Sequence, residues 1–270
     1  MKKIFAMLAV AACLFAVSCG KDDNKGGSTK TDDQTQTGDL PAALQHSAFI
    51  PIILDGVTFE SIKSKVTVDL RVDDKTNNLW VWEGTYTPGD GAGLNFFGNT
   101  EGYVSLKVGG AGWSGAGFCV YNSFKPAGAE DAFVAAKNPI AAIKSSIGAA
   151  PENWVLHVAY KGNARVAHIL GVDYAAGGKY SFAIGEGSLE DAGTTYNAIA
   201  PKSGEFEAGE WMEYEIPVAD LGIDFSADLP VDPYENNGKT EYRGYNILFC
   251  LSGGTTGNEI NLDAAYFYKK

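Results

Sequence analysis

The sequence predicts an all-β protein in which two antiparallel sheets pack as a sandwich. Short apolar stretches with strand-like alternation recur along residues 41–270, and Gly, Asn, Asp and Pro separate them. The 33 glycines suit a chain with many turns and bulges better than a helical chain. No internal repeat of the length typical of repeat arrays is evident. These observations favour a single β-sandwich domain with one or two short helices.

The first strand pair is expected at residues 65–82. Residues 65–72 alternate between apolar and polar side chains, as in a strand with one buried face. Residues 73–78 are rich in Asp and Asn, which favour turns, and the apolar stretch 79–82 follows them. We therefore expect a hairpin in this part of the chain.

The remaining elements follow from the same pattern. Further strands are expected at residues 103–108, 117–121, 154–160, 165–170, 180–184, 211–216, 245–251 and 262–268. One helical pattern covers residues 130–147, and Pro139 divides it because proline cannot continue a helix without strain. We expect two short helices or one kinked helix that covers an end of the sandwich.

The N-terminus has the order of a secretory signal peptide, which we assign to residues 1–18. The basic pair Lys2 and Lys3 precedes an apolar run over residues 4–17, and small residues surround Cys19. A permanent transmembrane helix is disfavoured, because a span needs about 20 apolar residues. Cleavage of this segment is the better interpretation.

The junction before Cys19 resembles the lipobox of bacterial lipoproteins, in which the cysteine is acylated and becomes the mature N-terminus. The resemblance implies that Cys19 carries acyl chains and anchors the protein to a membrane, since several chains give stable attachment. Lys21, Asp22 and Asp23 resemble the export signal of Bacteroidetes lipoproteins that face the cell exterior from the outer membrane. The alternative to the lipobox is an ordinary signal peptide with an incidental cysteine at position 19. The alternative to the export signal is a merely polar linker.

Residues 19–40 contain almost no apolar side chain, so they predict a flexible tether that connects the lipid to one domain at residues 41–270. The chain has 21 basic and 33 acidic residues, which makes nucleic acid and anionic lipid poor partners. Cys119 and Cys250 lie in apolar, strand-like stretches. They could form a disulfide or stay as buried free thiols, and the sequence leaves both options open.

Two stretches near the C-terminus resemble galactose-binding-like jelly rolls, the fold of many carbohydrate-binding modules. They are residues 211–218, an aromatic-led strand with an Ile-Pro turn, and residues 260–268, where Asp263 precedes an aromatic run. The resemblance implies a jelly roll that binds poly- or oligosaccharide. It also implies a structural calcium ion at Asp263, together with Glu60 from the first strand. The alternative role of Asp263 is to cap a turn.

The candidate sugar-binding residues lie in the middle of the chain. A sugar site needs exposed aromatic rings beside polar groups that reach hydroxyls. The candidates are Trp80, Trp82, Tyr86, Asn95, Asn99, Glu101 and Trp113, with Glu83 nearby. Trp80 and Trp82 share one face of their strand, which points outward if Leu79 and Val81 fill the core. The alternative places the tryptophans in the core, where they contribute much apolar area.

A second candidate surface consists of Tyr234, Asn236, Asn237, Tyr242 and Arg243, which could also be a solvated loop. Enzyme chemistry has little support, because His46, His157 and His168 have no metal-ligand spacing and no nucleophile or phosphate motif is present. We therefore expect a cell-surface lipoprotein that binds carbohydrate without catalysis. A structural or adhesive protein that binds another protein is one alternative, and a glycoside hydrolase with two facing carboxylates is the other.

Overall fold

The computed structural model describes residues 40–73, 77–100, 102–119, 141–163, 168–174, 177–227, 234–236, 239–241, 246–252 and 255–270. The predicted signal peptide, Cys19, the export signal and almost all of the tether lie outside these residues, and so does Glu101. No helix in the described ranges is both long enough and apolar enough to cross a membrane.

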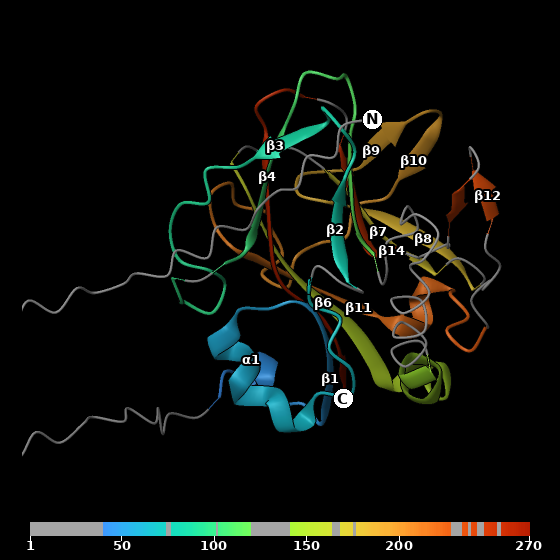
Figure 1. Ribbon diagram of the computed structural model, residues 1–270. Helices are drawn as coiled ribbons and strands as arrows, with labels where there is room; N and C mark the ends of the chain where they lie inside the picture. The colour runs from blue at the N-terminus through green and yellow to red at the C-terminus, as the bar shows by residue number, and fades with distance from the viewer. Residues whose placement is uncertain are drawn as a thin grey trace, which may run out of the picture.

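The described strands form two antiparallel sheets that pack face to face (Figure 1). The six-stranded sheet has the order β11 (Met212–Pro217), β6 (Trp154–Gly162), β15 (Glu259–Lys269), β4 (Val104–Val108) and β3 (Tyr86–Pro88), and β1 (Ala48–Ile53) also pairs with β15. The five-stranded sheet has the order β2 (Asn78–Val81), β5 (Ser114–Cys119), β14 (Asn246–Ser252), β7 (His168–Tyr174) and β8 (Gly178–Ile184). Strands β4, β5, β6 and β7 alternate between the sheets, as in a jelly roll. The predicted β-sandwich is confirmed.

Smaller elements complete the described part of the chain. Helix α1 (Gly56–Ile62) begins at Asp55, whose side chain accepts a hydrogen bond from the backbone N–H of Thr58. Two hairpins, β9 (Leu189–Asp191) with β10 (Thr194–Tyr196) and β12 (Tyr234–Asn236) with β13 (Lys239–Glu241), lie apart from the main sheets. The remaining short helices are η1 (Ala42–Leu44), η2 (Lys63–Lys65), η3 (Lys144–Gly148), η4 (Pro151–Asn153) and η5 (Val218–Leu221).

The apolar residues form two clusters on opposite sides of the six-stranded sheet. The larger cluster fills the space between the sheets and includes Leu156, Leu170, Phe182, Leu248 and Phe267. The second cluster lies between the outer face of the six-stranded sheet and helix α1, and it includes Phe49, Phe59, Ile62, Tyr266 and Tyr268. Helix α1 therefore closes much of that outer face (Figure 1).

Most of the expected strands are present, with boundaries that differ by a few residues. The expected hairpin at residues 65–82 is wrong. Residues 65–72 form only an isolated parallel bridge, between Val66 and Phe49, and β2 pairs with β5 instead. A regular parallel ladder would next need the N–H of residue 51, and Pro51 has none. Of the helical stretch predicted at residues 130–147, residues 141–147 are helical and residues 130–140 lie outside the described ranges.

Cys119 and Cys250 are free thiols, which settles the question that the sequence left open. Asn246 is the β14 partner of Cys119, whereas Cys250 pairs with Ala116, so the two cysteines lie at different positions along the sheet. Cys250 is part of the core between the sheets. The Cys119 thiol lies 2.9 Å from Oδ1 of Asn246. Burial raises the pKa of both thiols to about 12, so neither is a reactive thiolate.

Gly171 in β7 gives a direct test of the packing on the outer face of the five-stranded sheet. A Cβ atom at this position would lie 2.5 Å from the carbonyl oxygen of Tyr180 and 2.6 Å from the Phe249 ring. We predict that Gly171→Ala lowers the free energy of unfolding by about 1–3 kcal/mol. The added methyl group would overlap the carbonyl oxygen of Tyr180, and a backbone atom within a sheet cannot move away as easily as the end of a side chain. Urea unfolding measures this change. Gly110→Ala is the matched control, since nothing lies within 4 Å of its added Cβ, and equal stability of the two variants would contradict the described packing.

Candidate functional site

Two tryptophans, Trp80 in β2 and Trp82 directly after it, lie on the outer face of the five-stranded sheet. Leu79 and Val81 pack against the core between the sheets. Because side chains alternate along a strand, Trp80 points to the opposite face, and Trp82 follows directly after the strand. The indole of Trp82 is 37% exposed, and Trp80 is half-buried. Of the two orientations that the sequence left open, the structure has the one in which Leu79 and Val81 face the core and the tryptophans face outward.

Trp113 joins this face from the turn that precedes β5. Its side chain is 48% exposed, and its ring centroid lies 6.2 Å from that of Trp82, with the ring planes inclined by 59°. Both indoles lie over Gly115, where a Cβ atom would come within 3.0 Å of Trp82 and 3.1 Å of Trp113. The absence of a side chain at Gly115 lets both rings lie close to strand β5. We call Trp80, Trp82 and Trp113 the tryptophan surface.

Polar side chains lie beside the tryptophan surface on the same outer face. The carboxamide of Asn246 lies over Gly117, which is the β5 partner of Trp80. Asp173 of β7 pairs with Asn246, and Lys179 pairs with Asp173 on the far side. Burial raises the pKa of Asp173, and the nearby ammonium of Lys179 opposes this shift. The outer face thus combines indole rings with an amide and a carboxyl group.

The sequence did not point to Asn246 and Asp173 as candidates. They are far from the tryptophans along the chain, and only the pairing of β14 with β5 and β7 brings them to this face. The only signal in the sequence was a polar residue, Asn246, next to the apolar stretch 247–251 and another, Asp173, next to the apolar stretch 169–172. That signal says nothing about which strands become neighbours.

Tyr86 and Asn95 do not belong to an exposed sugar site, contrary to the prediction from the sequence. Tyr86 is 6% exposed and packs in the core between the sheets, because β3 directs it inward. Asn95 is 3% exposed. Its Nδ2 donates to Asp55, and its Oδ1 accepts from the backbone N–H of Asn99. Both polar ends of the Asn95 amide are therefore used within the protein.

Asn99 and Asp263 belong to the same buried network. The Asn99 amide donates to Oδ1 of Asp55 at 3.1 Å and to the Thr58 hydroxyl at 3.2 Å. Oδ2 of Asp263 accepts a hydrogen bond from the backbone N–H of Phe96 at 2.9 Å. These bonds attach residues 95–99 to the start of α1 and to β15. The network therefore holds a loop in place on the six-stranded sheet, at the opposite side of the sandwich from the tryptophan surface.

The two expected calcium ligands are not brought together. Glu60 lies in helix α1, not in a strand, and its carboxylate pairs with Lys63 in solvent. Asp263 is completely buried. Calcium requires six to eight oxygen ligands, and within the described ranges Asp263 is not part of a cluster of three or more His, Cys, Asp or Glu ligand atoms. The residues present do not fit the expected calcium site with Glu60.

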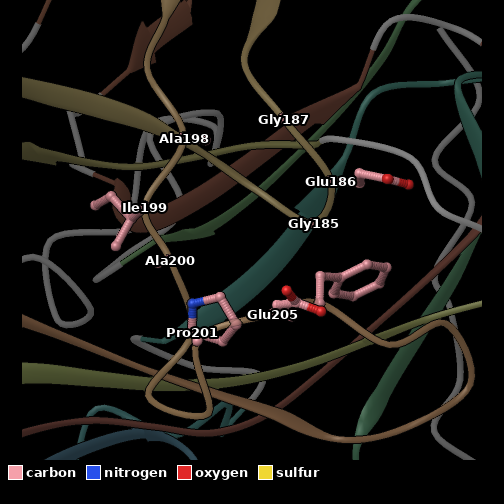
Figure 2. A pocket seen from close by; sticks show the side chains of 10 residues that line it. Gly185, Glu186, Gly187, Ala198, Ile199, Ala200, Pro201 and Glu205 are labelled. Carbon is pink, nitrogen blue, oxygen red and sulfur yellow. The ribbon is translucent and has the colours of Figure 1, made fainter.

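A pocket of about 390 Å³ lies between residues 185–187, which follow β8, and residues 198–206, which precede β11 (Figure 2). Glu186, Glu205, Ile199, Pro201 and Phe206 line it together with several glycines. Figure 2 shows the Glu186 side chain extending away from Glu205, so these two carboxylates do not face each other across the cavity. The arrangement lacks the opposed pair that glycoside hydrolysis requires.

Of the second candidate surface, Asn237, Tyr242 and Arg243 lie outside the described residues. Tyr234 and Asn236 belong to strand β12, which pairs with β13. The second candidate surface therefore stays a prediction.

No protein-family model and no curated protein matches the sequence. Among solved structures, a family 30 carbohydrate-binding module is 13% identical with a TM-score of 0.34, over 71% of this chain and 91% of that chain. The family 30 module of the cellulase Cel9D-Cel44B of Clostridium thermocellum is 13% identical with a TM-score of 0.35, over 72% and 92%. SGBP-B from a xyloglucan utilization locus of Bacteroides uniformis is 13% identical with a TM-score of 0.31, over 71% of this chain and 47% of that protein. At these values, the likeness does not identify which residues bind a ligand.

Asp263 gives a prediction on the pH dependence of stability. Burial raises the pKa of its carboxyl from 3.8 to about 6, although hydrogen bonds from Phe96 and Ala264 oppose the shift. The folded state then binds this proton more tightly than the unfolded state, so stability falls as the pH rises between these two values. Asp263→Asn keeps an acceptor for the Phe96 N–H and carries no charge. We predict that its stability relative to the wild type increases by about 2–3 kcal/mol between pH 4 and pH 7.

Urea unfolding of both proteins at the two pH values measures this difference. Asp220→Asn is the control, because Asp220 is exposed on η5. A stability relative to the wild type that falls or stays constant between pH 4 and pH 7 would contradict the prediction, and a fall would indicate that the ionised Asp263 is stabilised by a bound cation.

Proposed function

We propose that this chain is a cell-surface lipoprotein that binds carbohydrate without catalysis, and that the glycan lies on the tryptophan surface. The observation that carries the proposal is the pair of neighbouring, solvent-exposed indoles of Trp82 and Trp113. Tryptophan is usually largely buried, so two exposed rings in contact indicate a surface that a ligand covers.

The chemistry of the surface suits a sugar. The C–H face of a pyranose ring packs against an indole, while its hydroxyls need acceptors and donors at the edge of the contact. Asn246 and Asp173 supply an amide and a carboxyl group on the same outer face, next to Trp80 through Gly117. Trp80 is half-buried, whereas Trp82 and Trp113 are exposed to the solvent.

Charge favours a neutral glycan. The chain carries a formal net charge of −12, and the exposed Glu83 follows Trp82 directly. A polymer of uronic acids or sulfated sugars would meet electrostatic repulsion at this surface, which lowers both affinity and association rate. We therefore propose neutral polysaccharides or oligosaccharides as the ligands.

We further propose that a lipid anchor holds the domain at the cell surface, where such polymers occur. In this proposal, Cys19 is acylated, Lys21, Asp22 and Asp23 direct export to the outer face of the outer membrane, and residues 19–40 act as the tether. A flexible tether of this length lets the domain sample a range of orientations toward a polymer.

Removal of the rings tests the sugar site. We predict that Trp82→Ala and Trp113→Ala each weaken glycan binding by about 10- to 30-fold, because loss of a central aromatic contact typically costs about 2 kcal/mol. Calorimetry with a panel of neutral soluble glycans provides the affinities. Thermal unfolding of each variant shows whether the domain is intact.

Leu94→Ala is the matched control, since Leu94 is an exposed apolar residue that lies outside the tryptophan surface. It should leave the affinity unchanged. The proposal fails if folded wild-type protein binds no glycan, or if both tryptophan variants bind as tightly as the wild type.

Replacement of the lipidated cysteine tests the anchor. We predict that Cys19→Ser leaves the protein unacylated, so that it leaves the membrane fraction when it is expressed in a Bacteroidetes host. Fractionation with detection of a C-terminal tag measures the distribution. Cys119→Ser is the control and should remain with the membrane, and co-fractionation of the two variants would argue against lipidation at Cys19.

A further inference from the structure

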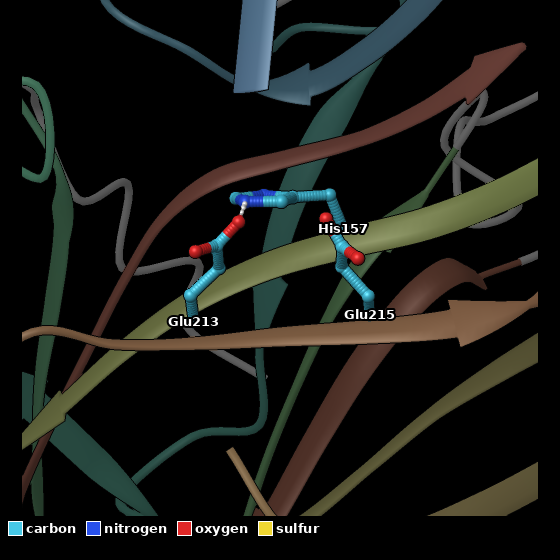
Figure 3. Close-up of side chains that lie close together, drawn as sticks. All are labelled: His157, Glu213 and Glu215. Atoms are coloured by element: carbon cyan, nitrogen blue, oxygen red, sulfur yellow. Dashed lines mark hydrogen bonds and ion pairs between the residues drawn. The ribbon is translucent and has the colours of Figure 1, made fainter. Parts of the chain in front are cut away.

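A second set of side chains lies on the outer face of the six-stranded sheet, apart from the tryptophan surface. Glu213 and Glu215 are two residues apart on β11, so both point to this face. His157 of β6 is the partner of Glu215 in the sheet. One ligand atom from each of the three residues lies within 4.8 Å of the others (Figure 3).

The imidazole of His157 is held in one orientation. It is fully buried and stacks on Tyr266, with ring centroids 4.6 Å apart and planes inclined by 3°. Its Nδ1 lies 2.6 Å from the carbonyl oxygen of Ala264. A carbonyl can only accept, so Nδ1 carries a proton and Nε2 is the atom that faces the carboxylates. A ring nitrogen donating to a backbone carbonyl while the other faces acidic groups is the usual arrangement of metal-binding histidines.

Nε2 of His157 lies 3.1 Å from Oε1 of Glu213. In a neutral imidazole this nitrogen has a lone pair, and two acceptors at this distance repel each other. A cation between them removes the repulsion. It is either a proton on Nε2 or a metal ion bound by both groups.

Lys202 holds the position of a cation beside the two carboxylates. Its ammonium lies 2.8 Å from Oε1 of Glu213 and 2.9 Å from Oε1 of Glu215. The Lys202 side chain is 49% exposed, whereas those of Glu213 and Glu215 are 23% and 26% exposed. The lysine can therefore move into solvent without a change in the sheet, while the carboxylates stay in place.

We propose that His157, Glu213 and Glu215 form a site for a divalent transition metal such as Zn²⁺, and that Lys202 occupies the site as an internal cation when the metal is absent. Nitrogen and carboxylate ligands at about 2.0–2.2 Å suit Zn²⁺ and place donors about 3.4 Å apart in a tetrahedron. Since the present ligand atoms lie within 4.8 Å of one another, the partly exposed side chains of Glu213 and Glu215 have to rotate toward the ion to reach this spacing. Two carboxylates balance the charge of the ion. Three protein ligands leave a fourth position for water or a ligand hydroxyl.

The site is independent of sugar binding, because it lies on the other sheet and shares no residue with the tryptophan surface. Zn²⁺ titration of the full chain, followed by calorimetry and by thermal unfolding, tests it. We expect one ion per chain and a higher unfolding temperature with Zn²⁺. Lys202→Met removes the competing cation, and we expect it to bind Zn²⁺ at least about tenfold more tightly than the wild type.

Lys269→Met is the matched control, because it removes the same charge from an exposed lysine at the end of β15. Its Zn²⁺ affinity should equal that of the wild type. In the Lys202→Met background, Glu213→Gln and Glu215→Gln should each weaken binding by about 10- to 100-fold, a range also seen when groups supporting a metal site are lost.

The proposal is overturned if neither the wild type nor Lys202→Met binds Zn²⁺. It is also overturned if binding survives both glutamine substitutions. If neither protein binds Zn²⁺, the contact between His157 and Glu213 is an ion pair in which Nε2 of His157 carries a proton. Lys202→Met then only lowers the stability of the fold.

Discussion

Strand β15 is the element on which the rest of the structure depends, because it is buried on both faces and paired on both edges. Every residue of Glu259–Tyr268 is buried. Its inner side chains, such as Phe267, enter the core between the sheets, and its outer ones, such as Tyr266, pack in the cluster under α1. Strand β6 pairs along one edge, and β4 and then β1 pair along the other. One strand thereby joins both clusters.

A bulge in β15 determines what lies on the outer face of the six-stranded sheet. The register with β6 shifts between Asp263 and Tyr266, and Ala264 has a φ of 44°, in the left-handed region. This geometry directs the Asp263 carboxyl to the N–H of Phe96 and the Ala264 carbonyl to His157. The same irregularity therefore holds the loop of residues 95–99 and sets the orientation of the histidine.

The sequence predicted the elements whose signal is local. The alternation around Leu79 and Val81 predicted that Trp80 and Trp82 share one face, opposite to the two aliphatic residues, but left open which of the two faces is buried. The sequence could not predict that Pro51 interrupts the pairing of β1 with residues 65–72. It also could not predict that strands β14 and β7 bring Asn246 and Asp173 close to the tryptophans. Tyr86 lies in β3, which has three residues, and so short a strand offers too little alternation to assign a face.

The two outer faces differ because of what the strands carry there. Helix α1 and the loop of residues 95–99 cover much of the six-stranded sheet. On the five-stranded sheet, β5 sends Ala116 and Phe118 into the core and has only Gly115 and Gly117 on the outside at these positions. Side chains from β14, from Trp82 just after β2 and from the turn before β5 lie over these glycines. A bulky residue at Gly115 would lift both indoles, so the shape of the tryptophan surface follows from the glycines beneath it.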